Sequence, residues 1–320
     1  MTGVLYATDH FPLPLPPGHR FPLAKYARLR ERIAARVPDL LAVAPAATDG
    51  ELGHAHDAAY VMATSAGTLG ADAQRRIGFP WSPEMVERSR RSAGATLAAC
   101  RTALATGCAV NLAGGTHHAH RDFGAGFCVF NDAAVAARAM QAEGRIRRAI
   151  VVDLDVHQGD GTASIFAGDA SVFTFSIHGR DNFPFRKAAS DLDIELADGT
   201  GDDAYLSALQ TGLQRALDRA RPQLAIYLAG ADPYAGDRLG RLALTKAGLA
   251  ARDRAVLDAL QVLGVPVAIA MAGGYADDVD DVIDIVDIHV ATVGEAIARF
   301  APERMLDWII PCDPGAGLCA

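Results

Sequence analysis

The sequence has few cysteines and lacks several familiar binding motifs. Five cysteines occur in 320 residues, and no two of them have CxxC spacing. The odd number and the missing motif argue against a disulfide framework and predict a reduced, cytoplasmic setting. The sequence also contains neither GxGxxG nor GxxxxGK[ST]. These absences argue against the common glycine-rich loops that bind dinucleotides and nucleoside triphosphates.

A second set of absences concerns membranes and nucleic acids. No uncharged apolar run approaches the roughly 20 residues that span a membrane. Residues 1–18 include Asp9, His10 and four prolines, which is not typical of a secretory signal. The net charge is −8, whereas proteins that contact phosphates carry clustered Lys and Arg. We therefore expect no membrane and no direct nucleic-acid partner, and the charge is compatible with a basic peptide substrate.

The sequence does contain a regular alternation of apolar runs and amphipathic stretches. A chain of 320 residues could form one α/β domain or split into two, and the sequence shows no linker. We expect a single domain over residues 1–320, with an irregular tail from about residue 309. The alternation predicts a parallel sheet flanked by helices on both faces. Residues 179–191 form the longest irregular stretch in the middle of the chain, and such loops are often functional. The expected strands are 108–112, 149–154, 172–177, 224–228 and 265–271, and the expected helices are 22–35, 82–105, 131–143, 202–220, 245–263 and 278–299.

Four polar clusters follow the ends of expected strands. They lie at residues 114–118, 155–157, 229–232 and 272–275. In an open parallel sheet, ligands bind at the carboxyl ends of the strands. Four clusters at the strand ends of one sheet therefore predict a shared cleft.

The second cluster gives the clearest indication of chemistry. Alternation along an extended strand would put Asp153, Asp155 and His157 on one face. The strand is too apolar for the surface, and buried carboxylates need a metal or a hydrogen-bonded histidine as partner. Asp155, His157 and Asp232 would make a three-ligand metal set. Such a set leaves a position open for water and substrate, as catalytic zinc requires.

The other clusters supply groups that would act beside such a metal. His117 and His118 are adjacent and can both approach a reacting water. Asp153 and Asp160 can hydrogen-bond these histidines, which would fix their tautomers and raise their basicity. Tyr275 can donate a hydrogen bond to a developing oxyanion.

Each feature also has a simpler explanation when it is taken alone. A His-His pair is common on surface loops, a DxH segment is more often a structural hydrogen-bonded pair, and GGY after a strand is more often a turn. Asp232 alone is compatible with a helix N-cap. The combination of the four clusters favours a metal hydrolase over these simpler explanations.

Four segments resemble the zinc-dependent histone deacetylase family of the arginase/deacetylase superfamily. In chain order they are GGTHHAHRDFGAGFCVFNDAAVAA, VVDLDVHQGDGT, AGADPYAGDRLGRL and AGGY. The resemblance covers nearly the whole chain and implies the family's arginase-like three-layer α/β fold. The third segment and the short chain are similar to class IV members and their bacterial relatives.

The resemblance implies a role for each motif residue. One catalytic Zn²⁺ would be held by Asp155, His157 and Asp232. His117 and His118 match the family's tandem histidines, and His118 would be the general base and acid. The remaining matches are Asp153 as support for His117, Asp160 as support for His118, Tyr275 as the residue that polarises the substrate carbonyl, and Gly126, Phe127 and Phe183 as walls of the acyl-lysine tunnel.

Further positions match the family less closely. A structural K⁺ is implied near Asp153, Asp155, His157 and Ser176. Arg20 would line an internal product channel, and Asp57 is the candidate for the acidic rim residue that grips the substrate backbone. The family's GGG and GGGY patterns read Gly114-Gly115-Thr116 and Ala272-Gly273-Gly274-Tyr275 in this sequence.

The resemblance implies hydrolysis of acyl-lysine, with acetyl or longer acyl groups, in a protein or peptide and without an organic cofactor. An acylated polyamine or another small amide is the alternative substrate. An arginase-type dimanganese site would need further carboxylates in the DxH and Asp232 motifs, and these are missing. An inactive acyl-lysine-binding protein is the remaining alternative, and the presence of every catalytic residue argues against it. The sequence gives no indication of the oligomeric state.

Overall fold

The structure is a computed structural model that describes residues 4–275 and 279–309. Its strands form a single parallel sheet in the order β2-β1-β3-β8-β7-β4-β5-β6. The parallel sheet expected from the alternation is thereby confirmed. The strands are β1 (Leu5–Ala7), β2 (Leu41–Val43), β3 (Cys108–Asn111), β4 (Ala149–Asp153), β5 (Val172–Gly179), β6 (Leu192–Leu196), β7 (Leu224–Leu228) and β8 (Val267–Ala270).

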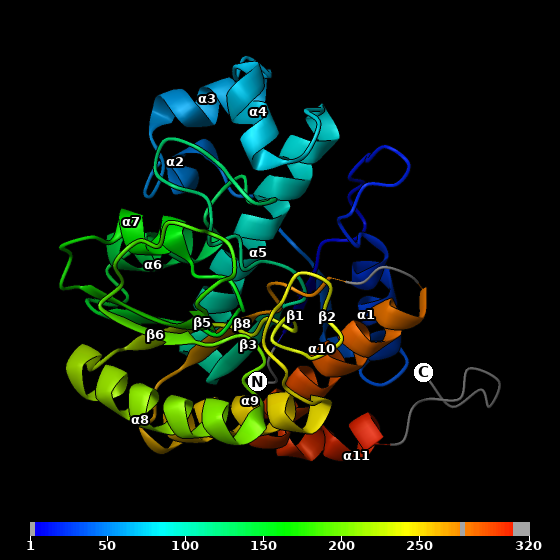
Figure 1. Ribbon diagram of the computed structural model, residues 1–320, viewed down its shortest axis with the longest axis vertical. Coiled ribbons are helices and arrows are strands. Elements are labelled where there is room, and N and C mark those ends of the chain that lie inside the picture. Colours follow the sequence, from blue (N-terminus) through cyan, green and yellow to red (C-terminus); the bar gives the residue numbers. More distant parts are fainter. Residues whose placement is uncertain (1–3, 276–278, 310–320) are drawn as a thin grey trace.

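Helices cover both faces of the sheet, as expected. In Figure 1, α8, α9 and α11 lie on one side of the strands, and α6 and α7 lie on the other. No helix in the described ranges is both long and apolar enough to span a membrane. The helices are α1 (Ala24–Ala34), α2 (Asp49–Leu52), α3 (Ala58–Ala66), α4 (Ala71–Ile77), α5 (Pro83–Thr106), α6 (Asp132–Ala142), α7 (Asp160–Ile165), α8 (Asp202–Ala220), α9 (Lys246–Val262), α10 (Val279–Phe300) and α11 (Met305–Ile309).

Side chains alternate between two hydrophobic cores. On β4, Ile150 and Val152 join the core that also holds residues of α1, α8, α9 and α10. Their neighbours Ala149 and Val151 join the core packed by α5 and α6. This period of two is what a strand covered on both faces requires, and it explains why the strand reads as a continuous apolar run.

The register of the four central strands brings their carboxyl ends together. Asn111 at the end of β3 is opposite Ala270 at the end of β8. Ala270 is also opposite Leu228, the last residue of β7, and Leu228 is opposite Asp153, the last residue of β4. The four loops that follow these strands therefore start side by side at one edge of the sheet.

The structure also contains elements that the sequence pattern did not predict. Strands β1 and β2 have three residues each, which is too short for a periodic signal. Strand β6, with the sequence LDIEL, is a partly exposed edge strand that follows the irregular stretch. That stretch begins after Gly179, because β5 extends to this residue. Most of the expected tail, including Cys312 and Cys319, and the expected start of the last helix at residue 278 lie outside the described residues.

Candidate active site

The DxH motif lies in a loop and not in the strand that precedes it. Strand β4 ends at Asp153, so strand alternation does not explain how Asp155 and His157 are placed, and that expectation was wrong. Carboxylates fold the loop instead. Asp153 Oδ1 accepts from the Asp155 N–H (3.2 Å), and Asp155 Oδ1 accepts from the His157 N–H (2.9 Å). Asp232 Oδ1 accepts from the Val156 N–H (2.9 Å), which ties this loop to the loop after β7.

These contacts gather the three expected metal ligands. Asp155, His157 and Asp232 each offer one ligand atom, and the three atoms lie within 4.8 Å of one another. The residues are 2%, 7% and 0% exposed. His157 Nδ1 is 2.9 Å from Asp155 Oδ1 and 3.2 Å from Asp232 Oδ2. Within the described ranges, this is the only group of three or more such side chains close enough to share an ion.

The environment of this cluster fits a divalent cation. Asp232 Oδ2 is buried and makes no hydrogen bond to the described residues. Burial, followed by repulsion from Asp155, raises the pKa of Asp232 to about 7. Burial opposes protonation of His157, but Asp155 and Asp232 outweigh it and raise the pKa of His157 to about 10. Two buried carboxylates thus demand positive charge, which zinc would provide with this oxygen and nitrogen donor set.

Glycine is required beside the cluster. A Cβ at Gly273 would collide with the carboxylate oxygens of Asp155 and Asp232. The Gly273 N–H instead donates to Asp155 Oδ2 (2.8 Å). The preceding Ala272 adopts φ +53°, the left-handed region that favours glycine, and it stands where the family pattern has a glycine. The buried Lys25 donates to the carbonyls of Ala272 and Gly274 at 3.1 and 3.2 Å, which holds this turn in place.

Two His–Asp pairs lie beside the cluster. His117 Nδ1 is 2.7 Å from Asp153 Oδ2, and His118 Nδ1 is 2.6 Å from Asp160 Oδ1. The two imidazole rings are 4.2 Å apart between centroids. Each pairing is the one implied by the resemblance. If Nδ1 of the neutral His118 carries the proton that Asp160 accepts, Nε2 of that ring is left as the acceptor.

The two histidines differ in basicity. Burial opposes protonation of His117, but Asp153 and Asp155 outweigh it and raise its pKa to about 9. Burial and the charge of His117 lower the pKa of His118 to about 4, despite Asp160. The pair therefore combines a cationic His117 with a neutral His118 that can accept a proton.

Tyr275 is held at the same edge by its backbone. Its N–H donates to Asp237 Oδ2 (2.6 Å), and Asp237 Oδ1 accepts from the N–H groups of Leu239 and Gly240 (both 2.8 Å). The phenol ring is 6.1 Å from the His157 ring. Burial and the nearby carboxylates of the cluster keep the pKa of Tyr275 well above its usual range. The phenol therefore stays protonated and remains a hydrogen-bond donor.

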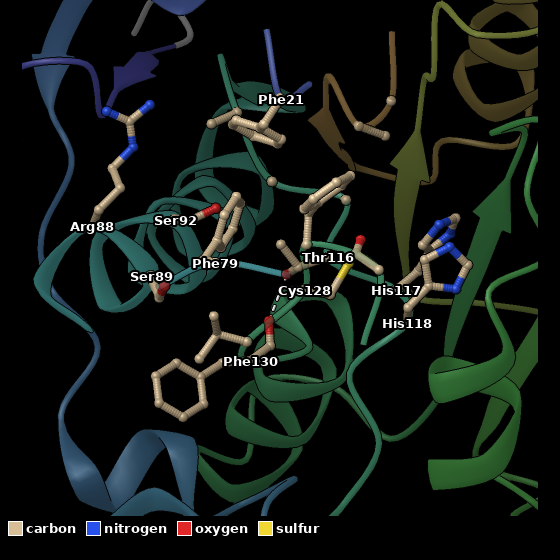
Figure 2. Close-up of a pocket in the computed structure, with 18 of the residues that line it drawn as sticks. Phe21, Phe79, Arg88, Ser89, Ser92, Thr116, His117, His118, Cys128 and Phe130 are labelled. Carbon is tan, nitrogen blue, oxygen red and sulfur yellow. Dashed lines mark hydrogen bonds between the residues drawn. The ribbon is translucent and has the colours of Figure 1, made fainter. Parts of the chain in front are cut away.

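Two cavities meet at these side chains. An inner cavity of about 70 Å³ is lined by residues that include His117, His118, Asp155 and Arg88. In Figure 2, Arg88 lies away from the two histidines. An outer cavity of about 510 Å³ is lined by His118, His157 and Tyr275. The expected tunnel residues Gly126 and Phe127 line both cavities, and Phe183 lines the outer one. The Phe183 ring packs edge-on to His118 at 4.8 Å.

Two weaker expectations do not match the structure. Arg20 lines the outer cavity and not an internal channel, and its guanidinium lies 5.3 Å from the centroid of the Phe127 ring. The basic residues that line the inner cavity are Lys25 and Arg88. Asp57 lines neither cavity and pairs with Arg121 at 2.7 Å. The acidic rim residue therefore has no counterpart at Asp57.

The sequence reasoning missed a buried arginine beneath the site. Arg252 on α9 is fully buried and donates to the carbonyls of Leu154 (3.2 Å) and Gly230 (2.6 Å). These carbonyls belong to the two loops that carry the metal-binding cluster. Arg252 also pairs with the buried Asp253 at 2.8 Å. A signal existed, because both charges fall on the apolar face of the helix expected at 245–263.

A second missed residue positions the histidine loop. Asp132, at the first turn of α6, is fully buried. Its carboxylate accepts from the N–H groups of Gly115 (2.9 Å) and Thr116 (2.8 Å) and from the Thr96 hydroxyl (2.6 Å). A Cβ at Gly114 would meet this carboxylate at 2.5 Å. The segment 114–116, which precedes His117, therefore folds around the carboxylate of Asp132.

The sequence of this chain is similar to the sequences of known proteins. The sequence pattern of the histone deacetylase domain matches residues 19–293. An uncharacterised protein of Picosynechococcus sp. is 44% identical over 281 residues, which cover 87% of this chain and 93% of that protein. A histone deacetylase-like amidohydrolase of Pseudomonas aeruginosa is 34% identical over 256 residues, which cover 73% of this chain and 66% of that protein.

Solved structures share the fold. The crystal structure of an HDAC homologue complexed with SAHA has a TM-score of 0.79 at 24% identity, covering 96% of this chain and 88% of that chain. The HDA15 HD domain has a TM-score of 0.73 at 22% identity, covering 96% of this chain and 95% of that chain. The arginase/deacetylase-like fold expected from the resemblance is thereby confirmed.

Proposed function

Because the chain belongs to the histone deacetylase family, an amide-hydrolysing family, we propose that it is a zinc-dependent lysine deacylase. It would remove acyl groups, acetyl or longer, from lysine side chains of proteins or peptides. The observation that supports this most strongly is the convergence of one metal-binding cluster, two His–Asp pairs and Tyr275 where two cavities meet. Membership of the class IV branch and a bacterial source remain predictions.

The metal would be held by Asp155, His157 and Asp232. When bound, zinc would polarise the amide carbonyl and activate a water for attack. One cluster of this kind in the described ranges favours a single ion over an arginase-type pair. A structural K⁺ also remains a prediction. The β4–β5 register, which pairs Asp153 with Ser176, is compatible with it.

The proton transfers would be carried out by the histidines. Neutral His118 would take a proton from the attacking water at Nε2 while Asp160 holds the ring through Nδ1. The same nitrogen would then deliver the proton to the departing lysine amine. His117, kept cationic by Asp153, would stabilise negative charge beside the reacting carbon. The Tyr275 hydroxyl would donate to the oxyanion of the tetrahedral adduct.

The substrate would enter through the outer cavity. Phe127 and Phe183 both line it, and they would pack against the methylene chain of the acyl-lysine. Gly126 permits this narrow approach, because a Cβ there would meet the His118 ring at 2.7 Å and the Phe183 ring at 3.3 Å. The side chains at this point would thus accept a thin, extended group.

The test is a turnover assay with acyl-lysine peptides of several acyl lengths and with acylated polyamines. We expect peptide hydrolysis that disappears with a chelator and returns with zinc. Hydrolysis that survives complete metal removal would contradict the proposal. Turnover of the acylated polyamines alone would favour the small-amine alternative. Peptide binding without turnover in the metal-loaded protein would identify an inactive acyl-lysine-binding protein.

A further inference from the structure

The outer cavity has a basic mouth. Arg20, Arg76 and Arg241 line it. Asp181 is the one acidic residue among its described lining residues, and it lies 3.6 Å from Arg180. The described lining residues therefore carry a net positive charge, although the whole chain carries −8. Charges that line a cavity act on whatever enters it more strongly than the net charge does.

Two of these arginines are available to a ligand. Arg20 and Arg76 are exposed, and neither pairs with a carboxylate among the described residues. Each guanidinium lies over an aromatic ring, at 5.3 Å from the Phe127 centroid and 4.6 Å from the Phe123 centroid. Such stacking limits the freedom of the side chain and leaves the donors of the guanidinium at its edge available. Arg241 contributes less, because it already pairs with Asp198 at 3.1 Å.

Their location distinguishes these arginines from ordinary surface charges. Phe127 lines both cavities, so the guanidinium over its ring lies at the entrance to the catalytic side chains. The neighbouring Arg75 provides the contrast. Arg75 lies on α4, as Arg76 does, but it lines neither cavity and pairs with Asp72. Arg75 is therefore paired with a carboxylate, whereas Arg76, at the next position, pairs with no carboxylate among the described residues.

We propose that the mouth selects acyl-lysine residues that are flanked by acidic residues in the peptide. This inference rests on the proposed deacylase function. An arginine fork binds a carboxylate with two parallel hydrogen bonds, so Asp or Glu beside the acyl-lysine would find partners at Arg20 and Arg76. The protonated amines of an acylated polyamine would meet the same arginines and be repelled. The mouth therefore favours an acidic peptide over both a basic peptide and a polyamine.

The experiment compares acetyl-lysine peptides that differ only in two flanking residues. The flanks are Asp, Asn or Lys, and N-acetylspermidine is a fourth substrate. Exposed ion pairs contribute about 0.2–1 kcal/mol each, so two of them should make kcat/KM for the Asp peptide exceed that for the Asn peptide by roughly two- to thirtyfold at low salt. The Lys peptide and N-acetylspermidine should fall below the Asn peptide. The preference should shrink as salt is raised.

The double variant Arg20→Gln/Arg76→Gln tests the assignment to these residues. It should abolish most of the preference for the Asp peptide, through KM. Arg75→Gln is the control for the position on α4: it removes one charge beside Arg76, whereas the double variant removes two, and it should retain the preference. An equal kcat/KM for the three peptides, or a preference that survives in the double variant, would overturn the proposal.

Binding is measured beside turnover, by fluorescence anisotropy with the same labelled peptides. If no peptide is hydrolysed, the proposed function fails, while the order of affinities still tests the basic mouth. Tighter binding of the Asp peptide would support the inference, and equal affinities would contradict it. The two failures can therefore be told apart.

Discussion

Two regions of the candidate site differ in how the chain builds them. The base holds Asp155, His157 and Asp232, and the mouth is lined by Arg20, Arg76 and Arg241. At the base, Asp155 and Asp232 lie in the loops after β4 and β7, and the register of these strands determines where the loops begin. At the mouth, Arg20, Arg76 and Phe183 come from loops and a short helix outside the central strands. The sheet thus positions the chemistry, whereas loops position the groups that meet the substrate. Selectivity can therefore change without disturbing the catalytic side chains.

The two regions also differ in charge and in burial. The base gathers buried carboxylates, whose interactions are strong because water is excluded. The mouth carries exposed arginines, whose interactions are screened by water and salt. Substitutions at the base should therefore have large effects on rate or stability, and those at the mouth should change only the choice of substrate.

The largest effect is expected at the proposed general base. His118→Ala should lower kcat by roughly 10⁴, the upper end of the range for acid–base catalysis, because His118 is the neutral histidine proposed to take the proton from the attacking water. His120→Ala is the control, since His120 contacts the same Asp160 at 3.2 Å but lines neither cavity. Steady-state kinetics with an acetyl-lysine peptide measures both. Comparable losses in the two variants would remove the special role of His118.

Arg252 tests whether the base depends on a support beneath it. Arg252→Met should lower the free energy of unfolding by about 3–5 kcal/mol, because it leaves Asp253 buried without its cation. Arg254→Met is the control, since Arg254 is exposed and pairs with Glu295 at the surface. Denaturant unfolding of both variants provides the measurement. A change of less than about 1 kcal/mol at Arg252 would show that the loops do not need it.

The oxyanion donor should have a somewhat smaller effect. Tyr275→Phe should lower kcat by roughly 10²–10³, with little change in KM, because the ring remains and only the hydroxyl is lost. Tyr6→Phe removes a hydroxyl that contacts Thr102 on α5 and lines neither cavity, so it should leave kcat unchanged. Full activity in Tyr275→Phe would exclude Tyr275 from the mechanism.

The smallest effect per pH unit is the contribution of His56 to the pH dependence of stability. His56 Nε2 accepts from the Asn131 N–H (2.9 Å), and burial lowers the pKa of His56 to about 4 from 6.5. The unfolded chain therefore binds the extra proton first as pH falls below 6.5. His56 then removes up to about 1.4 kcal/mol of stability per pH unit down to pH 4. His56→Gln should flatten this part of the stability profile, measured by urea unfolding between pH 7 and about pH 4. An unchanged slope would mean that His56 does not titrate there.

The sequence could predict the base because its residues follow apolar strands. The alternation located the ends of the runs at 149–154 and 224–228, and the topology of a parallel sheet then implied that Asp155 and Asp232 would meet. The backbone after β4 does not continue as the predicted strand. Asp155 and His157 are placed instead by hydrogen bonds between carboxylates and backbone N–H groups. Such contacts leave no periodic signal.

The mouth was harder to predict because no sheet register fixes it. The sequence favoured Arg20 for an internal channel and Asp57 for the rim, and neither lies there. The segments that carry these residues are short helices and loops, whose positions depend on packing far along the chain. The net charge of −8 was compatible with a basic substrate, whereas the cavity itself is lined by arginines. The net charge is a sum over the whole chain, so it cannot predict the sign of the charge around one cavity.

The most direct test of the account is a zinc titration of the metal-free protein, followed together by calorimetry and by hydrolysis of an acetyl-lysine peptide. Asp232→Asn is titrated in parallel, because Asp232 Oδ2 is a buried oxygen of the cluster that has no hydrogen-bond partner among the described residues. We predict one zinc ion per chain, activity that rises with occupancy, and binding that is at least about tenfold weaker in Asp232→Asn. Full activity before zinc is added, or equal zinc affinity in the two proteins, would contradict the account.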